Sequence, residues 1–177
     1  MLGKRAIELS LNFIIILIIS IVIFGFGVRF ISKLSREAID IEKITTDQLD
    51  EIIGDLVCEG SDRVCIGTDR KTISRGKWDT FGVKIINILD GQHFIIAVSR
   101  PNIRGYTKNK VEIRTDNLVW NPKERDVFIG KNEEETLGIA IQVPPSAVSG
   151  TYIFNVEIKT VEGNKYANVQ KLYVDVP

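Results

Sequence analysis

The feature that most constrains this chain is an uncharged run of 20 residues, Leu9 to Val28. Glu8 precedes the run directly and Arg29 ends it. At about 1.5 Å per residue, a helix of this length spans roughly 30 Å, the thickness of the hydrocarbon core of a bilayer. Its isoleucines fall on every side of a helix, whereas a soluble helix keeps a polar face. The run therefore predicts one transmembrane helix over residues 9–28.

A removable signal peptide is the main alternative for this run. Such a peptide has an apolar core of about 7–15 residues, followed by a cleavage site of small residues. The run is longer than that, and residues 24–31 (FGFGVRFI) are bulky and then basic. We therefore expect an uncleaved signal anchor.

Basic residues flank the run on both sides, so the positive-inside rule does not orient the helix. We expect these side chains at the membrane interface, where cationic groups reach water or anionic headgroups. The flanking residues are Lys4, Arg5, Arg29, Lys33 and Arg36. Two cysteines and a β-rich remainder suit an oxidising exterior. We thus expect residues 1–8 in the cytoplasm and the remainder outside the cell membrane.

The chain beyond the anchor is mildly acidic. Residues 37–177 hold 18 basic and 22 acidic residues, a net charge of −4. Proteins that bind nucleic acid instead gather an excess of lysine and arginine, because they must neutralise phosphates. We therefore expect the lipid bilayer as a partner, together with either a protein partner or self-assembly through the sandwich or the N-terminal helix, and no nucleic acid.

Apolar residues at helical spacing continue past the run and predict a helical stalk over residues 29–57. Within the stalk, Thr45 to Gln48 has the form of a capping box, which predicts a second helix from Thr46 to about Val57. The apolar stripe of this helix, which includes Leu49, needs a surface to pack on. We expect that surface at the base of the domain that follows.

From about residue 71 the apolar period changes to two, as residues 137–143 and 152–158 show most clearly. Asp90-Gly91 between two apolar runs predicts a two-residue hairpin. Turn signals recur and no helical pattern interrupts them. Residues 71–177 are therefore expected to form an antiparallel β-sandwich, for which a length of about 105 residues suffices.

Cys58 and Cys65, the two cysteines of the chain, bracket the short segment CEGSDRVC. A disulfide between them would stabilise the fold by roughly 2–3 kcal/mol. Two free thiols and a metal site are the alternatives, but structural zinc needs about four ligands and the chain has one histidine. Because C-x-x-C is absent, a thioredoxin-like site is excluded. We predict a disulfide-stapled joint over residues 58–70.

Few residues could carry catalysis. His93 stands alone at the start of a predicted strand, where a surface role is more common than that of a general base. The acidic triplet Glu133–Glu135 could help to hold calcium, but a solvated loop explains it more simply. No serine or cysteine has a nucleophile setting, and no glycine-rich phosphate loop follows a strand. We expect no enzyme activity, no cofactor and no metal.

Residues 138–161 (GIAIQVPPSAVSGTYIFNVEIKTV) resemble the end of immunoglobulin-like domains of prokaryotic, especially archaeal, surface proteins. The resemblance implies an immunoglobulin-like sandwich in which Tyr152 forms a tyrosine corner, with its hydroxyl bonded to nearby backbone. Phe154 occupies the place of an antibody-domain cysteine, so no bridge between sheets is implied. Trp120 is either a core anchor or the end of a strand.

Residues 3–24 (GKRAIELSLNFIIILIISIVIF) resemble the head of archaeal type IV pilin-like proteins, including archaellum components. The resemblance implies removal of residues 1–6, or of residues 1–3. The shorter cut would make Glu8 the fifth residue, where pilins carry a carboxylate that pairs with the amino terminus of a neighbour. A signal anchor preceded by basic residues accounts for the same sequence.

These patterns favour a non-enzymatic, single-pass surface protein that presents a sandwich outside the membrane, for protein binding or for envelope structure. A filament subunit with the apolar helix in the filament core is the alternative. A membrane-tethered enzyme or metal-binding domain is the second alternative, and it would require His93 or Glu133–Glu135 to line a pocket.

Overall fold

The computed structural model describes residues 3–36, 44–53 and 62–177, and within the first range it describes the side chains of residues 13–29. The chain divides into two compact units, Met1–Ile39 and Asp40–Pro177. We treat them separately and refer to the second unit as the body.

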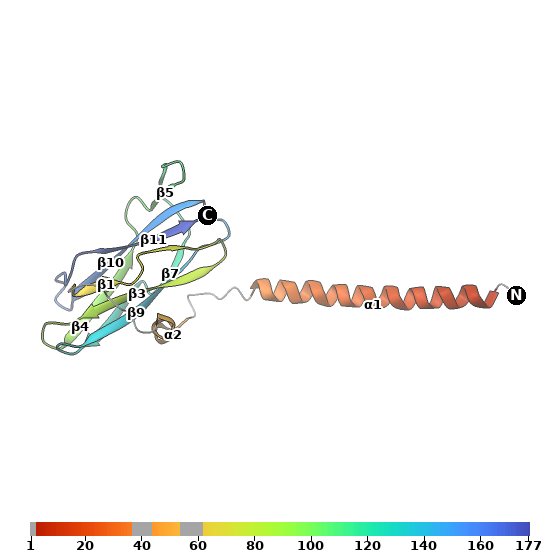
Figure 1. Cartoon of the computed structure of the whole chain (residues 1–177), viewed down its shortest axis with the longest axis horizontal. Helices are drawn as coiled ribbons and strands as arrows, with labels where there is room; N and C mark the ends of the chain where they lie inside the picture. The colour runs from red at the N-terminus through yellow and green to blue at the C-terminus, as the bar shows by residue number, and fades with distance from the viewer. Residues whose placement is uncertain (1–2, 37–43, 54–61) are drawn as a thin grey trace. The chain divides into compact units, whose positions relative to one another are not determined.

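The first unit consists of one helix, α1 (Gly3–Arg36), which is 34 residues long and contains the whole uncharged run (Figure 1). The hydroxyl of Ser20 donates to the Ile16 carbonyl, 2.8 Å away, so this polar group is satisfied within the helix. The large apolar side chains from Phe13 to Val28 are 45% to 73% exposed. Where side chains are described, no helix combines the length and hydropathy needed to cross a membrane.

The body is a sandwich of two sheets. The first sheet has the strand order β1-β3-β9-β7, in which all pairs are antiparallel. Its strands are β1 (Val64–Ile66), β3 (Trp78–Ile86), β9 (Glu134–Gln142) and β7 (Val119–Asn121).

The second sheet has the order β2-β11-β10-β4-β8 and is antiparallel except for the parallel pair β2–β11. Its strands are β2 (Arg70–Thr72), β11 (Gln170–Val176), β10 (Gly150–Thr160), β4 (Gln92–Ser99) and β8 (Glu124–Ile129). A small hairpin of β5 (Gly105–Thr107) and β6 (Glu112–Ile113) joins this sheet through β10. The predicted antiparallel sandwich is thus confirmed at the level of a mainly-β fold, with one parallel pair that the prediction lacks.

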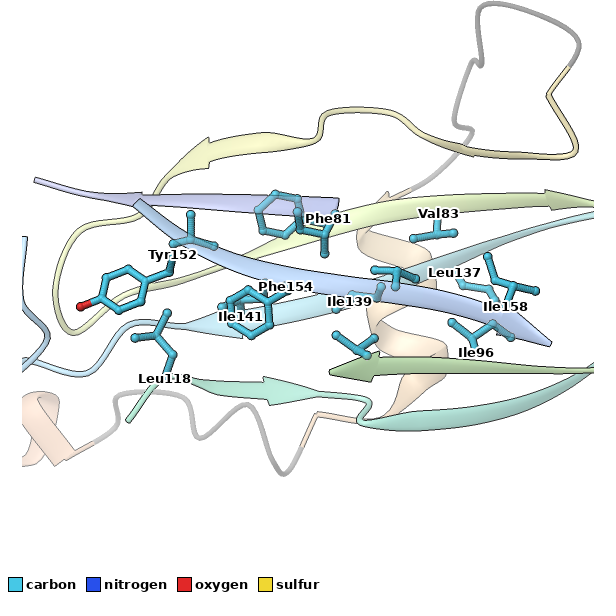
Figure 2. Packing of buried hydrophobic residues seen from close by; sticks show 14 of the residues in the cluster. Phe81, Val83, Ile96, Leu118, Leu137, Ile139, Ile141, Tyr152, Phe154 and Ile158 are labelled. Atoms are coloured by element: carbon cyan, nitrogen blue, oxygen red, sulfur yellow. The ribbon is translucent and has the colours of Figure 1, made fainter. Parts of the chain in front are cut away.

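The core lies between the sheets, where alternate residues of facing strands meet, as expected for a period of two (Figure 2). From the first sheet, Phe81 and Ile139 are fully buried, and from the second sheet Tyr152, Phe154 and Ile158 are buried to the same degree. Burying a large apolar side chain contributes roughly 1.5–3 kcal/mol each, so these rows supply most of the drive to fold.

The second helix, α2 (Thr46–Ile53), covers the outer face of the first sheet. Its predicted capping box is confirmed, because Thr45 N–H donates to Gln48 Oε1 (3.1 Å) and Gln48 N–H donates to Thr45 Oγ1 (3.4 Å). Leu49 is fully buried against Ala140. A Cβ at Gly138 would meet the Leu49 carbonyl at 2.6 Å, so glycine lets the helix lie this close to β9.

Asp50 of α2 forms polar contacts with both sheets. Its carboxylate accepts from the Gly138 backbone N–H at 2.8 Å, at a part of β9 that β7 does not reach. It also pairs with the Arg125 guanidinium of β8 at 2.7 Å, and both side chains are largely buried. The helix thus closes the side of the sandwich where β8 is the edge strand and the first part of β9 has no β7 partner.

Two predicted domain bounds differ from the structure. Residues 29–57 do not form one stalk, since α2 packs on the sandwich and belongs to the body. Strand β1 lies within residues 58–70, the predicted joint, and β2 begins at its last residue; both strands pair with strands of the sandwich. Helical spacing predicted α2 correctly but carries no information on where its apolar stripe packs. The part of the predicted helix beyond Ile53 lies outside the described residues.

The packing of α2 on the first sheet predicts that substitutions at two positions of this helix differ in their effect on the stability of the body. Leu49→Ala should lower the free energy of unfolding by about 2–4 kcal/mol, because it removes a fully buried side chain and leaves a cavity against Ala140. Urea denaturation of the full chain in detergent micelles, followed by tryptophan fluorescence, measures the change, since Trp78 packs at this contact.

Ile52→Ala is the matched control, because Ile52 is 55% exposed on the same helix. Its effect should stay within about 0.5 kcal/mol. Equal effects of the two substitutions would contradict the docking of α2 through Leu49.

Candidate functional site

The residues singled out for catalysis are used in structural contacts. His93 lies exposed on β4, its Nδ1 is 2.7 Å from Asp126 Oδ1, and its ring meets Phe128 edge-on at 5.3 Å. Glu133 accepts from the Gly130 N–H at 3.1 Å, and Glu134 pairs with Lys84 at 2.6 Å. Among the described residues, no three His, Cys, Asp or Glu side chains gather as a metal site. The arrangement gives no support to the enzyme or metal-binding alternative.

Three connections between strands, together with the first two residues of β9, form one end of the body, which we call the turn end: residues 87–91, 130–135 and 161–169. Asn87 joins two of them. It is fully buried, and its side-chain amide donates to the carbonyls of Ile129 (2.9 Å) and Gly130 (3.2 Å). Its backbone N–H donates to the Glu133 carbonyl at 2.9 Å. Strands β3 and β4 belong to different sheets, so residues 87–91 connect the two sheets and the two-residue Asp-Gly hairpin predicted from sequence is wrong.

Tyr166 joins the third connection to the first. Its hydroxyl donates to the Ile86 carbonyl at 2.6 Å and accepts from the Ile88 N–H at 3.1 Å. Its ring is buried and packs edge-on against Phe94, with 4.8 Å between ring centroids. A polar group that is buried and hydrogen-bonded in this way holds loops in one arrangement. The turn end is therefore preorganised.

The opposite end, which we call the hairpin end, consists of residues 73–77, 100–118 and 143–149. Figure 1 shows the β5 hairpin projecting from this end beyond the sheets. Arg75 donates to the Ala147 carbonyl at 2.7 Å, and Asn117 donates to Ser146 Oγ at 2.8 Å. These bonds tie the three segments together.

A buried ion pair anchors the long segment of the hairpin end. Arg100 and Asp116 form a salt bridge, and both side chains are about 5% exposed or less. The Arg100 guanidinium lies 4.0 Å from the centroid of the Phe154 ring, and Asp116 accepts from the Leu118 N–H at 3.0 Å. Burial lowers the pKa of Arg100, and the Asp116 carboxylate opposes this effect. The sequence patterns did not predict this ion pair, because its partners lie sixteen positions apart and no regular spacing relates them.

Tyr152 lies beside this pair. Its hydroxyl donates to the Val148 carbonyl, four residues earlier, at 2.8 Å. Burial and the Asp116 carboxylate both raise the pKa of the hydroxyl, which therefore stays a protonated donor. Whether Tyr152 is the tyrosine corner of an immunoglobulin-like domain stays a prediction.

Trp120 belongs to strand β7 and also contacts the core. Its ring centroid lies 5.4 Å from that of Phe154, and its indole N–H donates to the Val98 carbonyl.

The predicted membrane-interface residues all belong to α1, and among them Arg29 has a described side chain, which is exposed. The side chains of the others, and that of Glu8, lie outside the described residues. They are Lys4, Arg5, Lys33 and Arg36. Their roles, and that of the Glu8 carboxylate, stay predictions.

Cys65 lies in β1 and is disulfide-bonded. Its predicted partner, Cys58, lies outside the described residues, so the stapled joint stays a prediction. A surface hollow with a volume of about 610 Å³ adjoins this segment, between residues 62–64 and 165–170. Its charged side chains Asp62, Arg63 and Lys165 are exposed, and it has the character of a wide surface depression.

Neither a protein-family model nor a curated protein sequence matches the chain. Among solved structures, the chain is similar to the ASH/PapD-like domain 7 of human CEP192, with 12% identity and a TM-score of 0.46. That alignment covers 71% of this chain and 95% of the domain.

Two further similar structures are the E. coli chaperone DraB and a Niemann-Pick type C2 protein from Japanese carpenter ant. DraB is 13% identical with a TM-score of 0.37, over 64% of this chain and 55% of DraB. The ant protein is 12% identical with a TM-score of 0.42, over 66% of this chain and 90% of that protein. The chain thus spans about half the length of the chaperone. At these identities and TM-scores, the similarities give no argument about function.

The buried pair at the hairpin end yields a stability prediction. Asp116→Asn should lower the free energy of unfolding by about 3–5 kcal/mol, because it leaves the Arg100 charge buried without its counter-charge. Adding Arg100→Met should recover part of that loss, since an apolar chain over the Phe154 ring needs no ion partner. Thermal or urea unfolding of the single and double variants measures both effects.

The exposed pair Glu112–Arg114 provides the control. Glu112→Gln should change the free energy of unfolding by less than about 1 kcal/mol, because solvent screens the pair. A double variant as unstable as Asp116→Asn alone would show that the ion pair itself is not the cause.

Proposed function

We propose that this chain is a non-enzymatic, single-pass surface protein. In this proposal α1 anchors it in the membrane, and the body, an immunoglobulin-like sandwich, lies outside the cell and binds a protein partner. The N-terminus is cytoplasmic, and the flanking basic residues of α1 lie at the two interfaces.

The observation that carries the proposal is the uncovered apolar surface of α1. The 13 large hydrophobic side chains between Phe13 and Val28 are all at least 45% exposed, and they lie on every side of the helix. Water would hydrate this surface at a cost of about 25 cal/mol per Å². A bilayer removes that cost, and the backbone groups of a helix need no partner in lipid. The continuous helix meets that requirement, and among its described side chains the Ser20 hydroxyl is bonded internally.

The role of the body as a binding module is supported by the chemistry of its surface. The side chains that could serve catalysis are engaged in surface pairs and loop caps. Both ends of the sandwich, in contrast, present exposed apolar side chains on loops that buried polar groups hold in place. Rigid loops of this kind on a sandwich are suited to contact another protein.

A filament subunit is the second candidate. The helix begins at Gly3 and runs through Glu8, so removal of residues 1–3 would leave a helix with a carboxylate in its second turn. Packing of α1 helices in a filament core would cover the same apolar surface. Intact-mass measurement of the native protein separates the two proposals: Met1 retained favours the anchor, and a mature N-terminus at Lys4 or Ile7 favours the filament.

Membrane fractionation tests the anchor directly. The chain should stay in the membrane pellet after alkaline carbonate extraction, and protease treatment of intact cells should release the body. Ile18→Arg, at the centre of the uncharged run, should shift a large share of the chain out of the membrane, because a central charge costs about 2.5–3.5 kcal/mol on insertion.

Ile52→Arg, on the exposed face of α2, is the matched control and should leave the fractionation unchanged. Extraction of the unaltered chain by carbonate, or full protection of the body from protease, would refute the proposed display.

A further inference from the structure

The two ends of the body carry opposite charge. The turn end holds five acidic and two basic residues, whereas the hairpin end holds seven basic and two acidic residues. At the hairpin end, Arg100 and Asp116 neutralise each other in the interior. The surface excess therefore comes from exposed side chains, among them Lys108 and Lys110 at the hairpin tip.

Exposed apolar side chains gather at the same two places. Among the described residues of the body, the exposed large hydrophobic side chains other than Ile52 lie at, or next to, one of the ends. At the turn end they are Ile88, Leu89, Phe128, Val161 and Val169. At the hairpin end they are Tyr106, Val111 and Val148. Each end thus combines apolar side chains with an excess of one charge, and apolar side chains within a polar rim are the usual anatomy of a protein interface.

The apolar side chains of the turn end are continuous across strands. Val161 follows Thr160, which pairs with Phe94, so Val161 and His93 occupy neighbouring backbone positions at the turn end. His93 in turn contacts Phe128, and the Phe128 ring would lie 3.2 Å from a Cβ at Gly91. A row from Val161 to Phe128 results. Asp90 and Glu162 are exposed residues in the connections beside this row.

The hairpin end offers a surface of the complementary kind. The projecting hairpin is held to β10 by close backbone contact, since a Cβ at Gly150 would meet the Tyr106 carbonyl at 2.4 Å. Its tip carries Lys108, Lys110 and the exposed Val111. Because both ends are preorganised, little conformational entropy is lost when they meet.

We propose that the hairpin end of one copy binds the turn end of a second copy, so that bodies associate head to tail. This inference rests on the proposed function in that it names the protein partner as a second copy. The argument for that occupant is complementarity, because one chain presents both a basic and an acidic surface with apolar centres. A contact between two different surfaces is heterologous and, unless it closes a ring, continues into an open row of copies.

Two charge-reversal variants test the contact. Lys108→Glu with Lys110→Glu makes the hairpin tip acidic and lowers the net charge of the hairpin end from +5 to +1. Asp90→Lys with Glu162→Lys changes the net charge of the turn end from −3 to +1. Each variant alone should self-associate roughly ten-fold more weakly than the unaltered chain, because like charges then meet. An equimolar mixture of the two variants should restore association, because each reversed end then faces its complement.

Sedimentation velocity of the full chain in detergent micelles provides the measurement, at low and high salt (on the order of 0.05 and 0.5 M). Association of the unaltered chain should weaken at high salt. Lys171→Glu is the control and should leave association unchanged, because Lys171 is exposed on β11 opposite Asn155, at the middle of β10 and outside both defined ends. Association through α1 would be insensitive to all of these reversals, and that result would overturn the proposal.

Photo-crosslinking identifies the surface that is touched. A photoreactive amino acid in place of Val111 should link to residues 87–91, 130–135 or 161–169 of another copy. Links to a second hairpin, or to lipid, would overturn the proposal. A chain that stays in the membrane fraction but remains monomeric would also overturn it, and would leave the proposed membrane display intact.

Discussion

The packing of β9 against β10 across the inter-sheet space is the interaction on which the remaining structure depends. Ile139 and Ile141 of β9 meet Phe154 and Ile158 of β10, and all four side chains are almost fully buried. The outward-facing Ala140 of β9 is buried as well, because α2 lies over it. Strand β9 therefore contacts both the second sheet and α2. The helix can form this third layer because the outward-facing residues of β9, Gly138 and Ala140, are small.

Buried polar groups then set what the ends of the sandwich look like. A hydrophobic core by itself tolerates many loop conformations, whereas a buried amide or ion pair is stable only with its partners in place. Asn87 and Tyr166 impose this condition on the turn end, and Arg100 with Asp116 imposes it on the hairpin end. The surfaces proposed for association are thus consequences of groups that lie beneath them.

Sequence patterns predicted the elements with local causes. The capping box at Thr45 and the alternation in residues 137–143 and 152–158 act within a few residues, and both reappear in the structure. Patterns did not predict what depends on contacts far apart in sequence. The side-chain amide of Asn87 donates to carbonyls more than 40 residues away in the sequence. The parallel pair of β2 and β11 brings together a strand near the start of the body and its last described strand. No periodicity marks such partners, and the same holds for the packing surface of α2.

The position of β11 has a consequence for biosynthesis. Residues 170–176 fill the gap between β10 and β2, and Leu172 and Val174 are fully buried there. The second sheet therefore cannot close until these residues have left the ribosome, although α1 emerges more than 130 residues earlier. Until then, the edge of β10 that pairs with β11 has no partner. The nascent body must be kept from aggregating through this edge, and emergence of β11 is the event that lets the second sheet close.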